Sequence, residues 1–186
     1  ECIMILRGEA DDRAKATAEL SIELTARMLL LSGVADSIEV ARRSVESKIS
    51  GGEALERFRK NIECQNGDTR VCDDPEKLFD RNIKKQEIKA SRSGFVGAID
   101  TLAIGNALSE IGGGRVRAED EIDGAVGYEC VAQLGEQISA GDPVGILFYR
   151  VEAHLESARA KLSDAYTIQS NAPPQTPPLI HEVISA

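Results

Sequence analysis

The first third of the chain carries apolar residues at the spacing of helices. Between Asp11 and Ser32 these residues lie three or four positions apart, and Gly33 supplies a stop after them. The apolar positions are Ala16, Leu20, Leu24, Met28 and Leu31. The spacing predicts a helix that carries all five along one face.

Two more helices are predicted before residue 70. Asp36 is positioned to cap the second helix, with Glu39 three residues later to complete a capping box. Its apolar stripe is Ile38, Ala41, Val45 and Ile49, and Gly51–Gly52 ends it. The third helix carries Leu55, Phe58 and Ile62 and ends at Asn66–Gly67. Asp74–Pro75 then predicts a cap followed by proline at the first position of a short turn.

The pattern changes near Asp80, where strands begin. Predicted strands cover residues 83–90, 94–99, 128–134, 144–149 and 166–168, with a possible edge strand at 179–184. One helix is predicted at 101–111, burying Ile104, Ala107, Leu108 and Ile111. Another carries Val151, Leu155, Ala158 and Leu162, and the proline-rich tail 171–178 should be extended. Helices therefore come first and an α+β unit second, with a boundary between Cys72 and Ile83.

Composition narrows the class of protein. The 186 residues suffice for one large domain or two small ones, and an apolar share of 42% suffices for a core. The sequence has no apolar run long enough for a membrane span and no secretory pattern at its start, which is Glu1 and not Met. A start without Met indicates a chain that was cut or processed. A net charge of −9 repels nucleic acid and anionic membranes, so we expect neither as a partner.

The cysteines and histidines give no sign of a zinc site. Cys2, Cys64, Cys72 and Cys130 form no Cys-x-x-Cys pair, and the chain has only two histidines. Free thiols in a reducing cytosol are the favoured interpretation. His154 and His181 have no nucleophile elbow near them, so we expect both on the surface.

Three charged or glycine-rich segments could carry chemistry. Gly112–Arg115 could bind an anion, but it follows a helix, which favours a C-terminal cap and a tight turn. Glu119–Asp123 could bind a cation, but a solvated acidic loop is favoured because no histidine lies beside it. The basic residues are expected on an exposed edge strand, where they prevent aggregation; they are Arg81, Lys84, Lys85, Lys89 and Arg92.

The segment Gly135–Leu147 has the glycine and proline spacing of a barrel-sandwich hairpin, as in biotinyl and lipoyl carrier domains. Its glycines permit positive φ at the turns, and Pro143 stiffens the exit. A carrier needs a modifiable lysine at the hairpin tip, and the segment has none. The pattern therefore predicts the fold without the carrier chemistry.

Taken together, six segments resemble the C-terminal part of the pyrimidine nucleoside phosphorylase (thymidine phosphorylase) family. They are Ala54–Asp68, Val71–Leu78, Gly94–Asp100, Ile111–Glu129, Leu134–Leu147 and Pro177–Ser185, and their order and spacing match the family throughout. One departure directly follows the segment Gly135–Leu147. The family usually has Ile-His-Ala there, and this chain has Phe148–Arg150 instead.

The resemblance implies a fold and a reaction. Residues 1–80 would be a helical segment of the large α/β domain, and residues 81–186 a C-terminal domain of barrel-sandwich, α/β hammerhead-like type. Full-length members are cytoplasmic homodimers that convert a pyrimidine nucleoside and phosphate to the free base and (deoxy)ribose 1-phosphate. Their phosphate and base ligands lie in the N-terminal half, so we expect no catalytic and no substrate-binding residue in this chain.

The resemblance also implies one metal ligand. No cofactor is required, but some members bind a monovalent or calcium ion near the hinge through a glutamate that corresponds here to Glu1. Two alternatives stay open: a carrier or binding module of the biotinyl or lipoyl kind, and the C-terminal part of a phosphorylase that acts on nucleoside monophosphates.

Overall fold

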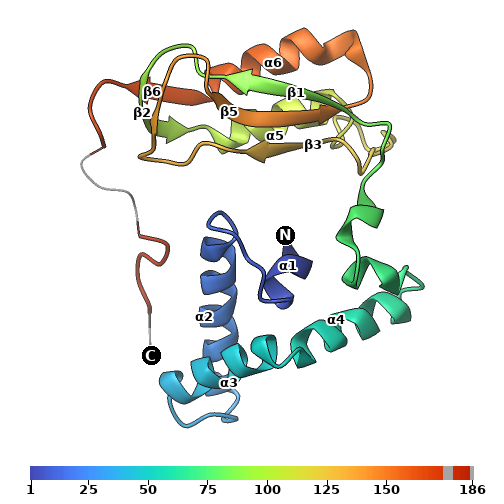
Figure 1. Cartoon of the computed structure of the whole chain (residues 1–186), viewed down its shortest axis with the longest axis vertical. Helices are drawn as coiled ribbons and strands as arrows, with labels where there is room; N and C mark the ends of the chain where they lie inside the picture. Colours follow the sequence, from blue (N-terminus) through green and yellow to red (C-terminus); the bar gives the residue numbers. More distant parts are fainter. Residues whose placement is uncertain (174–177, 185–186) are drawn as a thin grey trace. The chain divides into compact units, whose positions relative to one another are not determined.

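The computed structural model describes residues 1–173 and 178–184, and these form two compact units. The first comprises Glu1–Phe79 with residues 178–184, and the second comprises residues 80–173 (Figure 1). The first is helical and the second mixes helices with sheets, which confirms the predicted α+β class. No helix of the described residues is long and apolar enough to span a membrane.

The first unit consists of four α-helices and two 3₁₀ turns. They are α1 (Cys2–Leu6), α2 (Lys15–Leu31), α3 (Ile38–Ser50), α4 (Glu53–Cys64), η1 (Thr69–Cys72) and η2 (Pro75–Leu78). The three predicted helices are confirmed as α2, α3 and α4. The edge strand predicted at residues 179–184 is wrong, because this segment has no strand pairing. Of the tail predicted to be extended, residues 174–177 lie outside the described part.

The helix ends show why these helices begin and stop where they do. The predicted cap of α3 is wrong by one residue: Ser37, not Asp36, precedes the helix, and its hydroxyl accepts from the Val40 N–H at 3.3 Å. The end of α4 is confirmed, with Asn66 in the left-handed region at φ 60°. Pro75 opens η2 as predicted, but the Asp74 side chain makes no capping bond.

The second unit contains two antiparallel sheets of three strands each. Their orders are β1-β5-β3 and β4-β2-β6. The strands are β1 (Lys84–Lys89), β2 (Gly94–Ile99), β3 (Gly127–Cys130), β4 (Gln137–Ile138), β5 (Pro143–Tyr149) and β6 (Tyr166–Gln169). Two α-helices and a 3₁₀ turn complete the unit: α5 (Thr101–Glu110), η3 (Glu152–His154) and α6 (Leu155–Asp164).

The ribbon Gly135–Leu147 crosses between the sheets and does not fold back on itself. Its strands β4 and β5 belong to different sheets, so the predicted hairpin is wrong. The physical reason lies at its two positive-φ glycines, since the Gly135 N–H binds the Val96 carbonyl at 2.8 Å and the Gly141 N–H binds the Ala90 carbonyl at 2.9 Å. The first turn is thus held by β2 and the second by the residue that follows β1. Both sheets are open, and the described residues form no closed barrel.

One core joins both sheets and both helices of the second unit. Leu147 of β5, Val96 of β2 and Leu162 of α6 are completely buried in it. The predicted inner face of α5 is confirmed, because Ile104, Ala107 and Ile111 are buried and Leu108 packs against them. Val151, by contrast, is exposed, because α6 begins only at Leu155.

Two tyrosines meet inside this core. The hydroxyls of Tyr128 on β3 and Tyr166 on β6 lie 3.3 Å apart, and burial raises the pKa of Tyr128 to about 12. The Tyr128 ring lies over Gly145 of β5, where an added methyl group would come within 2.0 Å of the hydroxyl oxygen. Gly145 therefore provides the space in which the tyrosine pair forms.

We predict that Gly145→Ala destabilises the second unit by about 1–3 kcal/mol, because the Tyr128 ring must leave its place and lose its contact with Tyr166. Urea unfolding followed by tyrosine fluorescence measures the change. Gly127→Ala is the matched control, since nothing lies within 4 Å of its added methyl group. Equal stability of the two variants would contradict the prediction.

Candidate functional site

The first unit contains an apolar cleft bounded by four helices. It has a volume of about 630 Å³ and lies among α1, α2, α3 and α4. Ile5, Leu6, Ile22, Leu29, Val45 and Phe58 supply its apolar lining. Thr17, Ser21, Thr25 and Lys48 are among its polar positions. One signal for this cleft is present in the sequence, since Ile22 and Leu29 of α2 lie off the apolar face predicted for that helix.

Small residues bring two walls of the cleft together. Ala26 of α2 and Ala41 of α3 are fully buried, and Ala35 in the connecting loop joins them in one cluster. A methyl side chain lets two helix backbones approach more closely than a leucine would. The close contact fixes α2 and α3 relative to each other and so fixes the side of the cleft that they form.

A buried carboxylate locks the same helix pair. Glu23 of α2 accepts from Arg42 of α3 at 2.8 Å and pairs with Arg27 at 2.5 Å, one oxygen to each guanidinium. The hydrogen bonds from Arg42 and then Arg27 hold the pKa of Glu23 below its ordinary value of 4.5. Arg42 also binds Glu19 at 2.8 Å, at an exposed position. These pairs compensate the burial of the Glu23 charge.

The wall formed by α4 is attached through a forked arginine. Arg59 binds both carboxylate oxygens of Asp73, at 2.7 and 3.0 Å, and donates to the Thr69 carbonyl at 3.0 Å. This ties α4 to η1, whose Val71 and Cys72 are buried with Ile3 of α1. Arg42 and Arg59 thus use their charges to join helices of this unit.

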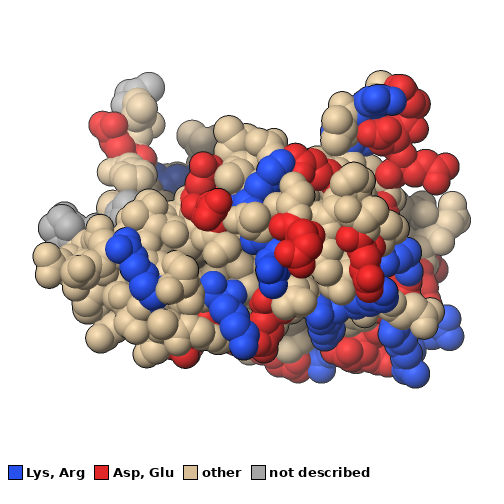
Figure 2. Space-filling view, turned by 90° about the horizontal axis from the view of Figure 1, so that it is seen from above, with Lys and Arg blue, Asp and Glu red and all other residues tan. Residues whose placement is uncertain are grey.

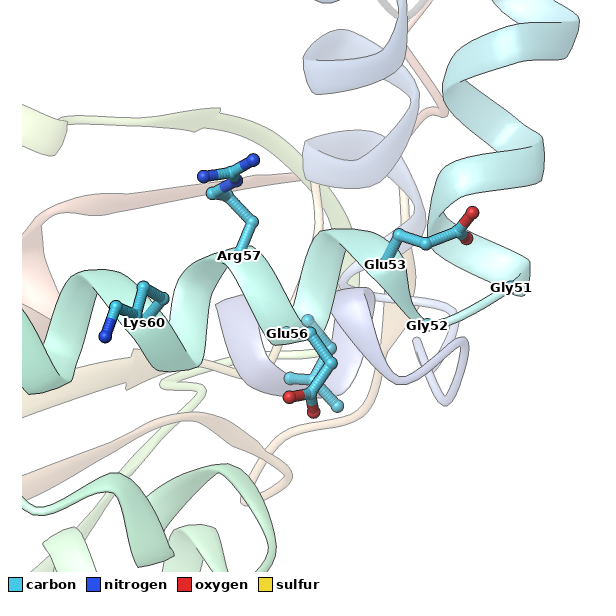
Figure 3. A pocket seen from close by; sticks show the side chains of 7 residues that line it. Gly51, Gly52, Glu53, Glu56, Arg57 and Lys60 are labelled. Atoms are coloured by element: carbon cyan, nitrogen blue, oxygen red, sulfur yellow. The ribbon is translucent and has the colours of Figure 1, made fainter.

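A second hollow lies at the Gly51–Gly52 turn and the start of α4. Figure 3 shows that its side chains diverge, with Glu56 and Arg57 on opposite sides of the helix. Glu53 is engaged by Lys48 at 2.8 Å. Because no group of side chains converges on one point here, this hollow does not form a binding site.

Glu1, the predicted metal ligand, is exposed and directly precedes α1. Its backbone carbonyl accepts from the Ile5 N–H at 3.0 Å, and its side chain makes no capping bond. Among the described residues, no group of three or more histidine, cysteine, aspartate or glutamate side chains is arranged to hold a metal ion. The assignment of Glu1 stays a prediction.

The glycine segment after α5 is a helix cap. The Gly113 N–H binds the Leu108 carbonyl at 2.9 Å and the Gly112 N–H binds that of Ser109 at 3.3 Å, with Gly112 at φ 95°. This pair of bonds is the Schellman motif. The turn that follows is closed by Asp120, whose carboxylate accepts from the N–H groups of Val116 and Arg117. The Gly112 and Gly113 amides are thus used in the helix cap, and a carboxylate of the chain binds the next amides, Val116 and Arg117.

The acidic loop has a structural role through Asp123. The Arg150 side chain binds Asp123 at 2.6 Å and Asp80 at 2.8 Å, and it holds the pKa of Asp123 below its ordinary value. Arg150 is the last residue of the Phe148–Arg150 segment that departs from the family pattern. It joins the first residue of the second unit to the loop before β3.

Of the basic cluster predicted on an edge strand, Lys84, Lys85 and Lys89 lie on β1, whereas Arg81 precedes the strand and Arg92 follows it. β1 pairs only with β5, so it is an edge strand. Lys84 binds Glu152 at 2.6 Å, and the Lys85 ammonium lies 5.1 Å from the centre of the Phe148 ring. On the face shown in Figure 2, basic side chains alternate with acidic ones and form no continuous basic surface. His154 and His181 are both exposed, as expected.

Comparison with known proteins relates this architecture to one class of enzyme. Residues 95–169 match the family described as the pyrimidine nucleoside phosphorylase C-terminal domain. The chain is 32% identical to the pyrimidine-nucleoside phosphorylase of Bacillus subtilis over 185 residues, which is 100% of this chain and 41% of that protein. It is 30% identical to the thymidine phosphorylase of Burkholderia cenocepacia over 164 residues, 88% of this chain and 37% of that protein.

Residues 95–169 of the second unit thus match the C-terminal domain of pyrimidine nucleoside phosphorylases. The chain belongs to the pyrimidine nucleoside phosphorylase family and corresponds to the C-terminal part of its members. It spans about two fifths of the length of the curated relatives that it matches.

We predict a pH-dependent effect of Glu23→Gln. The wild-type carboxylate has a pKa below 4.5, so its stabilising contribution is complete above that pH and is lost as the pH falls through the lowered folded-state value. The variant should therefore be less stable than wild type at pH 7, and the difference should shrink below pH 4.5. Thermal unfolding followed by circular dichroism at 222 nm measures both.

Glu19→Gln is the control for this experiment, since Glu19 contacts the same Arg42 but is exposed. Its effect should be the smaller of the two at pH 7. A difference between wild type and Glu23→Gln that is constant from pH 7 to pH 3 would contradict the prediction.

Proposed function

We propose that this chain is the C-terminal portion of a thymidine or pyrimidine nucleoside phosphorylase. The whole enzyme would convert a pyrimidine nucleoside and phosphate to the base and (deoxy)ribose 1-phosphate. The observation that carries the proposal is the agreement along the full chain with the Bacillus subtilis relative, together with the C-terminal domain match at residues 95–169.

Within such an enzyme the chain would act as a scaffold. Phosphorolysis needs preorganised cations and hydroxyls around the leaving base, the sugar and the phosphate. In this chain Arg42, Arg59 and Arg150 are each bound to carboxylates that join helices or loops, and the 630 Å³ cleft of the first unit is apolar. Phosphate and nucleoside would therefore be held by the part of the enzyme that this chain does not span.

The second unit would supply the barrel-sandwich, hammerhead-like domain of the family. Its two sheets share one core, to which β5 contributes Leu147 and β2 contributes Val96. The ribbon Gly135–Leu147 passes from one sheet to the other, as a sandwich requires. The whole enzyme would be a cytoplasmic homodimer without a required cofactor, and Glu1 would be one ligand of a monovalent or calcium ion near its hinge.

We predict that the isolated chain releases no uracil or thymine from uridine or thymidine in the presence of phosphate. The reason is the absence of a converging cationic site among its described residues. Base release measured by chromatography tests this, with the full-length Bacillus subtilis relative as positive control. Phosphate-dependent turnover well above background would refute the scaffold role.

Joining the chain to the rest of an enzyme tests the family role directly. In a chimera, the portion of the Bacillus subtilis relative that this chain does not span precedes Glu1. We expect this chimera to regain phosphate-dependent base release. A folded but inactive chimera would count against the proposed function.

A further inference from the structure

Helix α2 exposes the apolar face that its sequence predicts. Leu24, Met28 and Leu31 lie one turn apart in succession and are 55%, 68% and 88% exposed. Single exposed leucines are ordinary, but three on one helix face form a continuous apolar strip. The face that α2 buries is a different one, with Glu23 and Ala26 against α3.

A third face of α2 is also apolar. Ala18, Ile22 and Leu29 line the cleft, about 130° around the helix axis from the exposed strip at 100° per residue. α2 thus carries two separate apolar faces, the exposed strip and the cleft face, besides the side with Glu19, Glu23 and Arg27. A helix on the surface of a domain normally has one apolar stripe, so two such faces indicate a helix with apolar neighbours on more than one side.

The first unit is too thinly packed to supply all of these neighbours by itself. Its two buried clusters contain three fully or nearly buried residues each, and one of them consists of alanines only: Ala26, Ala35 and Ala41. The second unit, in contrast, buries large residues of both sheets in one core. The first unit has large apolar side chains, but most of them face the cleft or the solvent.

We propose that α2 is the central helix of a core completed by the remaining portion of the phosphorylase, the three fifths of the relatives that this chain does not span. That portion covers the strip Leu24–Met28–Leu31 and inserts apolar side chains into the cleft. The inference rests on the proposed function and adds the docking surface to it.

A second copy of this chain fits the surface less well. The strip from Leu24 to Leu31 is only about 10 Å long, and one helix pair along it buries far less than the roughly 800 Å² per partner of a stable dimer. A symmetric contact through the strip would also leave the cleft, on another side of α2, uncovered. A polypeptide that is continuous with Glu1 can reach both surfaces, because Cys2, Ile5 and Leu6 of α1 already line the cleft.

Thiol labelling tests the docking surface. Met28→Cys and Leu24→Cys are made singly, in a background in which Cys2, Cys64 and Cys130 are changed to serine. Each variant is prepared both as the isolated chain and as the Bacillus subtilis chimera. The cysteines of the portion added in the chimera are also replaced. Buried Cys72 reports folding. We expect maleimide labelling of both positions to slow by roughly tenfold or more in the chimera. Leu102→Cys, at a 73% exposed position of the second unit, is the matched control and should label equally in both proteins.

The outcomes separate the docking surface from the catalytic role. Unchanged labelling at both positions, with Cys72 protected as in the isolated chain, overturns the inference. Labelling of the isolated chain that slows as its concentration rises also overturns it, because a second copy is then the occupant. Protection in an inactive chimera supports the docking surface and counts against the proposed function. Activity without protection supports the proposed function and overturns the docking surface.

Discussion

The contact between α2 and α3 determines the form of the helical unit. Two buried alanines bring the helices together, and Glu23 on one helix is held by Arg42 on the other. Glu23 also pairs with Arg27 of its own helix, so removing either arginine would leave one oxygen of a buried carboxylate without its partner, which costs more than the ion pair contributes when formed. Since the cleft walls depend on this pair, the shape of the apolar surface also depends on it.

The two units differ in how they bury their apolar side chains. In residues 80–173 the chain passes repeatedly from one sheet to the other, so strands that are distant in sequence share one core around Leu147 and Val96. In the first unit the helices follow one another along the chain and contact mostly their neighbours. Local contacts suffice to form the helices, while their outward apolar faces remain to be covered.

Much of the secondary structure follows from the sequence because its signals are local. The end of α5 at Gly112 and the edge position of the lysine-bearing β1 are both predicted from short patterns. The choice of Ser37 over Asp36 as the cap is a matter of one residue, and both side chains can accept the same bond. The sheet switch in the ribbon 135–147 depends on bonds to Val96 and Ala90, which no local pattern contains. The cleft depends on how four helices pack together, which no local pattern contains. The apolar spacing of α2 therefore predicted that the segment is a helix, but not which of its faces is buried.

The bridge from Arg150 to Asp80 and Asp123 gives the entrance of the second unit a distinct sensitivity. All three side chains are partly open to solvent, so dissolved ions screen the attraction between them. The apolar core of the unit does not depend on attraction between charges, so the same ions do not weaken it in this way. Raising the ionic strength would loosen the first residue of the unit before any strand separates. The junction at Asp80 would then gain freedom while the sheets kept their pairing, which makes salt concentration a means of varying the stiffness of the connection without altering the parts that it joins.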